Sequence, residues 1–177
     1  MKRKTLETDI TVEYAPEKIQ IDTGDRVLDH MLKAMFFYMG VSVRIEAKSD
    51  LPHHLWEDTG IAIGSFLAGE HPRDRINRFG NTIMPMDEAL VLISVDISRC
   101  FVNLDLSITA PETGFSEGLF SEFVRGLSRN LKACIHIKQL EGENAHHIIE
   151  AGFKGLGKAL GEALGEKEML QSTKGRL

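Results

Sequence analysis

Hydrophobic and polar positions recur with two different spacings along this chain, and each spacing predicts one kind of secondary structure. Segments in which apolar residues alternate with polar ones, or form a short continuous run, are expected to be strands: 7–14, 17–22, 41–47, 88–98, 101–108 and 131–140. Segments with apolar residues three and four positions apart are expected to be helices: 27–40, 53–67, 119–130 and 145–164. Turns are expected at 71–80, 111–114 and 141–144. The mixture favours an α+β fold.

An internal repeat divides the chain into two halves of similar pattern. The motif HHxxE opens the helix expected from residue 53, and it recurs 93 residues later, at the start of the helix expected from residue 145. The two copies comprise His53, His54, Glu57, His146, His147 and Glu150. In both copies the motif follows a helix and then a strand. We therefore expect one domain, 1–177, built of two structural repeats at about 1–88 and 89–177, each with helices on a small, mostly antiparallel sheet.

The duplication changes how the histidines are interpreted. A single histidine pair would most simply be a pair of surface or capping residues, but two copies at matched offsets, each with a glutamate, favour chemistry. His30 lies 23 residues ahead of the first motif and Glu122 lies 24 residues ahead of the second, and both side chains are able to bind metal. His71 and His136 fall outside this pattern and are expected to be a loop residue and a strand side chain.

Helical geometry indicates how the motifs could work. At about 100° per residue, His146, His147, Glu150 and Lys154 lie on one face, at about 0°, 100°, 40° and 80°. Neighbouring histidines diverge too far to chelate one ion comfortably, so each pair should serve two different metals. The first copy has Ile61 where the second has Lys154, so only one half supplies the extra amine.

These considerations lead to a hypothesis of two metal ions. The ligand pool is His30, His53, His54, Glu57, Glu122, His146, His147 and Glu150. The pool contains no thiolate and leaves room for six ligands at each ion, which favours manganese over a structural zinc. Coordination positions left open could bind substrate or water.

Composition and charge exclude several classes of function. The net charge is −5 and the chain has no long run of lysine and arginine, which argues against nucleic-acid partners and anionic membrane surfaces. No stretch of 18 apolar residues occurs, and the charged start lacks the apolar core of a secretory signal. Cys100 and Cys134 are expected to be buried, reduced thiols. We expect a cytoplasmic protein that acts on a small molecule.

Eight segments, spread in order along nearly the whole chain, then indicate a family: TLETDI, VLDHML, HHLWEDTGIAIG, INRFG, PMDEAL, VDISR, ENAHHIIEAGFKGLGKAL and STKGRL. By these segments the chain resembles the imidazoleglycerol-phosphate dehydratase family. The resemblance implies a pseudo-twofold pair of halves with helices packed between two small, mostly antiparallel sheets, an architecture of the ribosomal protein S5 domain 2-like type. It also implies two Mn²⁺ ions per active site and a homo-oligomer of 24 copies.

The activity implied is the dehydration of D-erythro-imidazole glycerol phosphate to imidazole acetol phosphate in histidine biosynthesis, by way of an imidazolate bound to two metals. In the matching positions, the groups for proton transfer and hydroxyl handling are Glu7, Lys154, Glu57 and Glu150. The matching phosphate-binding positions are Arg78, Arg99, Ser172 and Lys174.

Two other classes of function fit the duplicated motif. One is a metal-dependent assembly or storage protein, in which Lys154, Arg78 and Lys174 would have no task. The other is a different dinuclear metal enzyme, such as a hydrolase of a phosphorylated metabolite.

Overall fold

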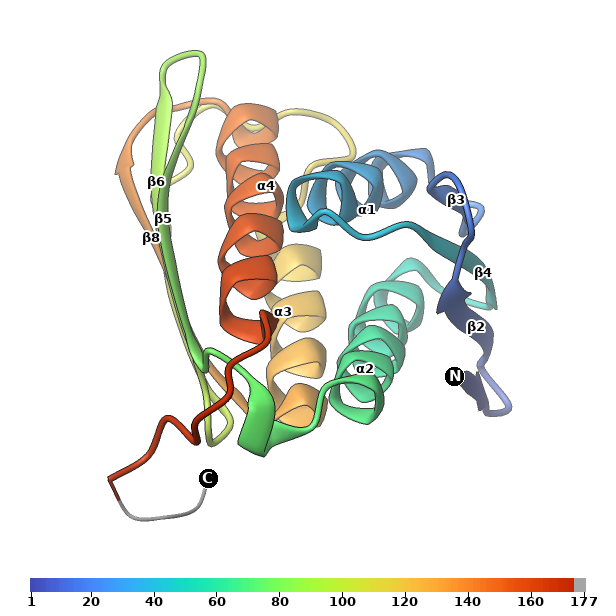
Figure 1. Cartoon of the computed structure of the whole chain (residues 1–177). Coiled ribbons are helices and arrows are strands. Elements are labelled where there is room, and N and C mark those ends of the chain that lie inside the picture. Colours follow the sequence, from blue (N-terminus) through green and yellow to red (C-terminus); the bar gives the residue numbers. More distant parts are fainter. Residues whose placement is uncertain (174–177) are drawn as a thin grey trace.

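The computed structural model describes residues 1–173 and places four helices between two four-stranded sheets (Figure 1). The helices are α1 (Arg26–Met39), α2 (Pro52–Glu70), α3 (Glu117–Leu131) and α4 (Ala145–Leu164). The first sheet contains β1 (Lys2–Lys4), β2 (Thr8–Tyr14), β3 (Gln20–Asp22) and β4 (Val43–Ser49). The second contains β5 (Phe79–Met86), β6 (Ala89–Ile97), β7 (Phe101–Asp105) and β8 (Ala133–Glu141). The expected α+β fold, with helices between two small sheets, is confirmed.

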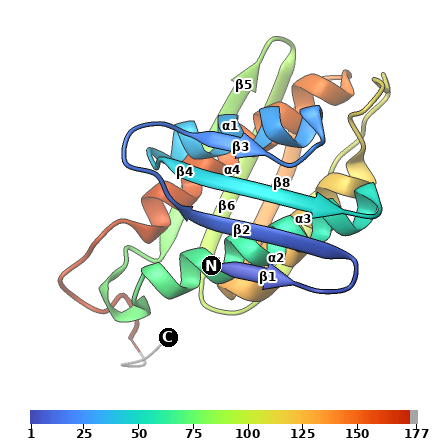
Figure 2. The same cartoon turned by 90° about the vertical axis from the view of Figure 1, so that its right-hand side faces the viewer.

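Both sheets have the same topology. The strand orders are β1-β2-β4-β3 and β5-β6-β8-β7. Each strand of the second order comes four strands later in the chain than its counterpart in the first. In each sheet a hairpin is followed by one further antiparallel pairing and by one parallel pairing at the edge. Figure 2 shows the first sheet face-on, with its helices behind it. The sheets are therefore mixed, with antiparallel pairs in the majority.

The alternate burial of side chains along the strands explains why each sheet turns one face toward the helices. In β6 every second side chain from Ala89 to Ile97 is buried, as expected for a strand with one face toward a core. The buried side chains of both sheets and all four helices form one continuous hydrophobic cluster. Within the described residues, no helix has the length and apolar character that a membrane crossing requires.

The helices pair across the two halves: α1 packs on α4, and α2 packs on α3. Glycines bring the backbones of each pair close together. A Cβ on Gly157 of α4 would lie 2.0 Å from the carbonyl oxygen of Met35 in α1, and a Cβ on Gly60 of α2 would lie 2.2 Å from that of Phe123 in α3. Any larger residue at these glycines would have to push the helices apart.

The helices lie close to their predicted positions, and α4 has the predicted bounds. Two strands were not predicted from the sequence. β1 consists of only three charged residues, and β5 contains glycine, asparagine and proline, which are uncommon in strands. The division expected near residue 88 falls inside the β5–β6 hairpin, where Met86 pairs with Ala89, so the chain moves to the second sheet earlier, before Phe79. The expectation of a buried Cys100 is wrong, since it is exposed, and Cys134 is half-buried.

Candidate active site

One group of potential metal ligands forms where α1 crosses α4. His30 from α1 and His146 from α4 both point at the carboxylate of Glu150 in α4. Their Nε2 atoms lie 3.0 and 2.8 Å from the same oxygen, Oε2. The three donor atoms lie within 4.8 Å of one another, and Glu150 is only 5% exposed. Two imidazole nitrogens and a carboxylate oxygen at this spacing suit a divalent cation.

Lys154 lies one helical turn beyond Glu150 and completes this group. Its Nζ atom is 2.8 Å from Glu150 Oε1 and 3.2 Å from the sulfur of Met86. Burial by itself would raise the pKa of Glu150, but Lys154, His30 and His146 together hold that pKa below its usual value. Glu150 is therefore an anion in contact with an amine on one oxygen and with two imidazoles on the other.

A second group forms at the other helix crossing. His53 and Glu57 from α2 meet Glu122 from α3, again with donor atoms within 4.8 Å of one another. His53 Nε2 lies 3.7 Å from Glu57 Oε2. Each group thus combines the motif of one half with the preceding helix of the other half.

The remaining histidine of each motif points elsewhere. His54 Nδ1 lies 2.8 Å from Asp50 Oδ1 and 3.9 Å from Glu7 Oε2. His147 Nδ1 lies 2.5 Å from Glu88 Oε2. Hydrogen bonds to Asp50 and Glu88 raise the pKa values of His54 and His147, respectively. Neighbouring histidines therefore do face different partners, as the helical spacing predicted.

Turn carboxylates near these histidines were missed by the sequence analysis. The backbone N–H of Asn144, the N-cap of α4, donates to Glu88, and together with His147 it lowers the Glu88 pKa to about 2. Glu112 Oε1 lies 3.4 Å from His146 Nδ1, while Phe115 stacks on the His146 ring with 4.2 Å between centroids. Asp50 could have been found from its position four residues before His54, and Glu88 from the segment PMDEAL.

Of the predicted phosphate-binding residues, Arg78 lies at the other end of α4. Arg78 donates through Nε and Nη2 to Asp96, at 2.6 and 3.1 Å, and through Nη1 to the carbonyl of Gln171. Its backbone N–H donates to Ala163, near the end of α4. Arg99 is exposed and Ser172 half-buried, whereas Lys174 lies outside the described residues.

Within one chain the structure therefore separates Arg78 from the first ligand group. Helix α4 has 20 residues, and it spans about 30 Å at about 1.5 Å per residue. His146 lies near the start of that helix and Arg78 lies beside its end.

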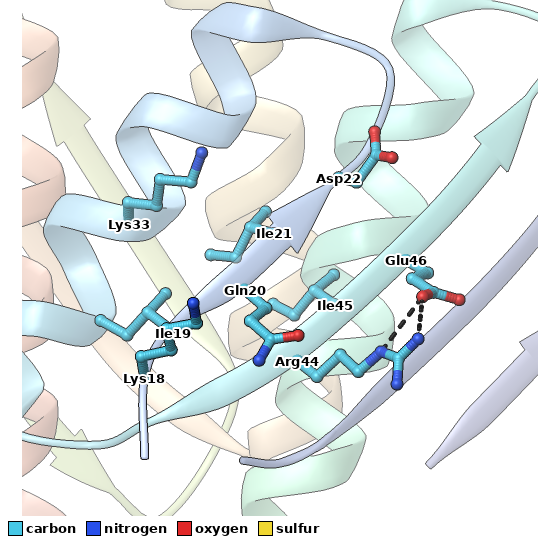
Figure 3. Close-up of a pocket in the computed structure, with 9 residues that line it drawn as sticks. All are labelled: Lys18, Ile19, Gln20, Ile21, Asp22, Lys33, Arg44, Ile45 and Glu46. Carbon is cyan, nitrogen blue, oxygen red and sulfur yellow. Dashed lines mark hydrogen bonds and ion pairs between the residues drawn. The ribbon is translucent and has the colours of Figure 1, made fainter. Parts of the chain in front are cut away.

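One hollow in the surface, of about 390 Å³, lies over β3 and β4 (Figure 3). Lys18, Lys33 and Arg44 line it, and Arg44 is paired with Glu46. None of its lining residues is a candidate site residue, so this hollow is separate from the ligand groups.

Fold and site together define a class: an α+β protein of two similar halves, in which crossing helices assemble histidine and carboxylate groups suited to divalent metals. Comparison with known proteins supplies the family. A sequence model of imidazoleglycerol-phosphate dehydratase matches residues 23–160. The chain belongs to the imidazoleglycerol-phosphate dehydratase family, metal-dependent hydro-lyases of histidine biosynthesis.

Relatives in sequence and structure agree. The chain is 57% identical over 178 residues to imidazoleglycerol-phosphate dehydratase of Pyrococcus furiosus, with 100% of both chains covered, and 40% identical to that of Desulforudis audaxviator, with 99% and 95% covered. A crystal structure of the P. furiosus protein in complex with (S)-C348 superposes with a TM-score of 0.97 and covers 100% of both chains. The Staphylococcus aureus enzyme superposes with a TM-score of 0.84 at 34% identity, covering 94% of this chain and 98% of that one.

Proposed function

We propose that this chain dehydrates D-erythro-imidazole glycerol phosphate to imidazole acetol phosphate with the residues assembled at its helix crossings. The observation that carries the proposal is the pair of three-donor groups, His30 with His146 and Glu150, and His53 with Glu57 and Glu122. Their nitrogen and oxygen donors fit divalent metals of the manganese type. Two Mn²⁺ ions per site are the proposed cofactors, with His54 and His147 as further ligands.

The bound metals would supply Lewis-acid polarisation of the imidazole nitrogens of the substrate. The chain itself must move two protons. The hydroxyl next to the ring leaves as water once its oxygen gains a proton, and the neighbouring carbon gives up its C–H proton to a base. The enol that results becomes the ketone of the product.

Lys154 Nζ and Glu7 Oε2 are the groups proposed for these proton transfers. Lys154 lies at the first ligand group, where it touches Glu150 Oε1. The Glu7 side chain is 57% exposed, and it lies 3.9 Å from His54. Glu57 and Glu150 would accompany them as carboxylates beside the metals. Each proposed group thus lies next to a histidine motif and can reach a substrate held there.

Arg78, Arg99, Ser172 and Lys174 are proposed to bind the substrate phosphate. The distance along α4 between Arg78 and the first ligand group exceeds the length of the substrate, which supports a site completed by another copy of the chain. We propose a homo-oligomer of 24 copies, each a single domain of residues 1–177, working in the cytoplasm. The continuous hydrophobic cluster through both halves supports the single domain.

Substitution of one lysine tests the function. Metal-loaded wild-type protein should convert imidazole glycerol phosphate to a ketone, followed by NMR. Lys154→Ala should lower turnover about 100-fold or more, because a positioned proton-transfer group is lost, while manganese content stays unchanged. The matched control is Lys158→Ala, an exposed lysine on the same helix, which should leave turnover unchanged. Full activity of Lys154→Ala would remove that residue from the mechanism, and an inactive wild-type protein would refute the function.

A further inference from the structure

The orientation of the motif histidines follows a rule. For three of the four, Nδ1 is the nitrogen next to a carboxylate outside the motif: Asp50 at 2.8 Å from His54, Glu88 at 2.5 Å from His147, and Glu112 at 3.4 Å from His146. In the ligand groups it is Nε2 of His30 and His146 that meets Glu150, and Nε2 of His147 lies 3.4 Å from Asp87 Oδ2. An imidazole that donates its Nδ1 hydrogen to a carboxylate keeps the Nε2 lone pair free for a metal.

Glu88 occupies the same place in the second half as Glu7 occupies in the first. Each lies in the turn of the hairpin formed by the first two strands of its sheet. Each is the residue directly before the second strand, Glu7 before β2 and Glu88 before β6. Each also approaches Nδ1 of the second histidine of its half. The duplicated fold therefore provides two equivalent carboxylates.

The two equivalent glutamates are held very differently. Glu88 accepts hydrogen bonds from the backbone N–H groups of Asn144 and Glu143, at 3.0 and 3.4 Å, while it contacts His147. Glu7 stays 3.9 Å from His54, because Asp50 has taken the Nδ1 position there at 2.8 Å. In the first half a separate residue, Asp50, contacts Nδ1 of the second histidine. In the second half the hairpin glutamate itself, Glu88, makes that contact.

We propose that Glu88 is a positioning residue that accepts the Nδ1 hydrogen of His147 and directs Nε2, which faces Asp87 Oδ2, to a divalent metal, as Asp50 does with Nε2 of His54. Of the two equivalent hairpin glutamates, only Glu7 then remains available to the substrate. This division of roles explains how a nearly symmetric fold presents one reactive carboxylate at this position. The inference rests on the proposed function, because it assumes that the histidines bind metal.

The experiment measures Mn²⁺ binding directly, by the electron paramagnetic resonance signal of free Mn²⁺ during titration of the metal-stripped full chain. Glu88→Ala should weaken Mn²⁺ binding about 10- to 100-fold, the usual range for removal of a residue that orients a metal-binding histidine. Glu88→Gln should bind within a few-fold of wild type, because its amide oxygen can still accept from Nδ1–H and from Asn144. Glu143→Ala, whose side chain is exposed beside the same turn, is the matched control and should bind like wild type.

The proposed difference in role between Glu88 and Glu7 is tested with variants of Asp50 and Glu7 as well. Asp50→Ala should weaken Mn²⁺ binding as Glu88→Ala does, and it keeps the inference testable if Glu88→Ala does not fold. Glu7→Ala should bind Mn²⁺ like wild type and lose turnover instead. Wild-type affinity in Glu88→Ala or Asp50→Ala, equal losses in Glu88→Ala and Glu88→Gln, or weakened binding in Glu7→Ala would overturn the inference. A wild-type chain that binds no Mn²⁺ would refute the proposed metal function first, and the wild-type titration identifies that case.

Discussion

At the scale of single residues, Arg78 shows how neighbouring residues orient a side chain that is proposed to bind the substrate. Its backbone adopts φ 73°, in the left-handed region that few side chains favour. Asp96 accepts from two of its guanidinium nitrogens, and Ser98 donates a further hydrogen bond to Asp96. A guanidinium fixed by a carboxylate along one edge has a defined direction for its remaining donors. Asp96 is thus the residue that orients Arg78.

Asp96→Asn should lower the free energy of unfolding at neutral pH by about 1 kcal/mol, because a paired, half-buried carboxylate loses its charge. Burial would raise the pKa of Asp96, but hydrogen bonds from Arg78 and Ser98 lower it below its ordinary value. A lowered folded-state pKa means that the stabilisation is present above the unfolded value of about 4 and is lost as pH falls through the folded value. Chemical denaturation from pH 7 to pH 3 should therefore show the two proteins converging in acid. A difference in free energy of unfolding that stays constant across this pH range would contradict the pairing of Asp96 with Arg78.

At the scale of elements, the candidate site depends on how closely two helices approach. Gly60 lies three residues after Glu57 in α2, and its nearest neighbour is the carbonyl of Phe123, the residue after Glu122 in α3. The contact that sets the helix spacing is therefore next to the ligand group that spans the two helices. Gly157 of α4 approaches the carbonyl of Met35 in α1 as closely, but further from the ligands, seven residues after Glu150 and five after His30.

Gly60→Ala should lower the free energy of unfolding by about 1–3 kcal/mol, because the added methyl group overlaps backbone and pushes α3 away. It should also weaken Mn²⁺ binding at the second group, since Glu122 moves with α3. Gly69→Ala in the same helix is the matched control: no atom lies within 4 Å of its Cβ position, so helix propensity should leave stability unchanged or raise it slightly. Denaturation and metal titration of both variants measure these effects, and similar behaviour of the two would refute the close-approach argument.

The elements also show what the sequence could and could not predict. Three helices, α1, α3 and α4, were found from strong apolar periodicity and α2 from a weaker helical pattern, while the motif duplication indicated six of the eight ligand candidates directly. The pairing of helices across the halves was not predicted, because glycines such as Gly60 and Gly157 look like ordinary helix glycines until both partners are seen. The turn carboxylates Glu88 and Glu112 carry no periodic signal, so hydrophobic patterning alone could not reveal them.

At the scale of the whole molecule, the first ligand group and the predicted phosphate-binding residue Arg78 lie at opposite ends of α4. His146, Glu150 and Lys154 belong to the first half of that helix, while Arg78 lies beside its end and donates to the segment that contains Ser172. A single copy cannot place both parts on one small substrate across a helix about 30 Å long. On the proposed function, a working site would combine the first ligand group of one copy with Arg78 of another.

Co-expression of two inactive variants tests this arrangement. Homo-oligomers of Lys154→Ala and of Arg78→Ala should each have little activity. Mixed oligomers should regain about a quarter of wild-type turnover, since about one site in four would join an intact Lys154 from one copy with an intact Arg78 from another under random assembly. Turnover of the purified mixture, compared with that of separately purified variants combined without exchange of copies, measures the gain. If both residues served the same site from within one copy, no intact combination could form and the mixed oligomers would stay inactive.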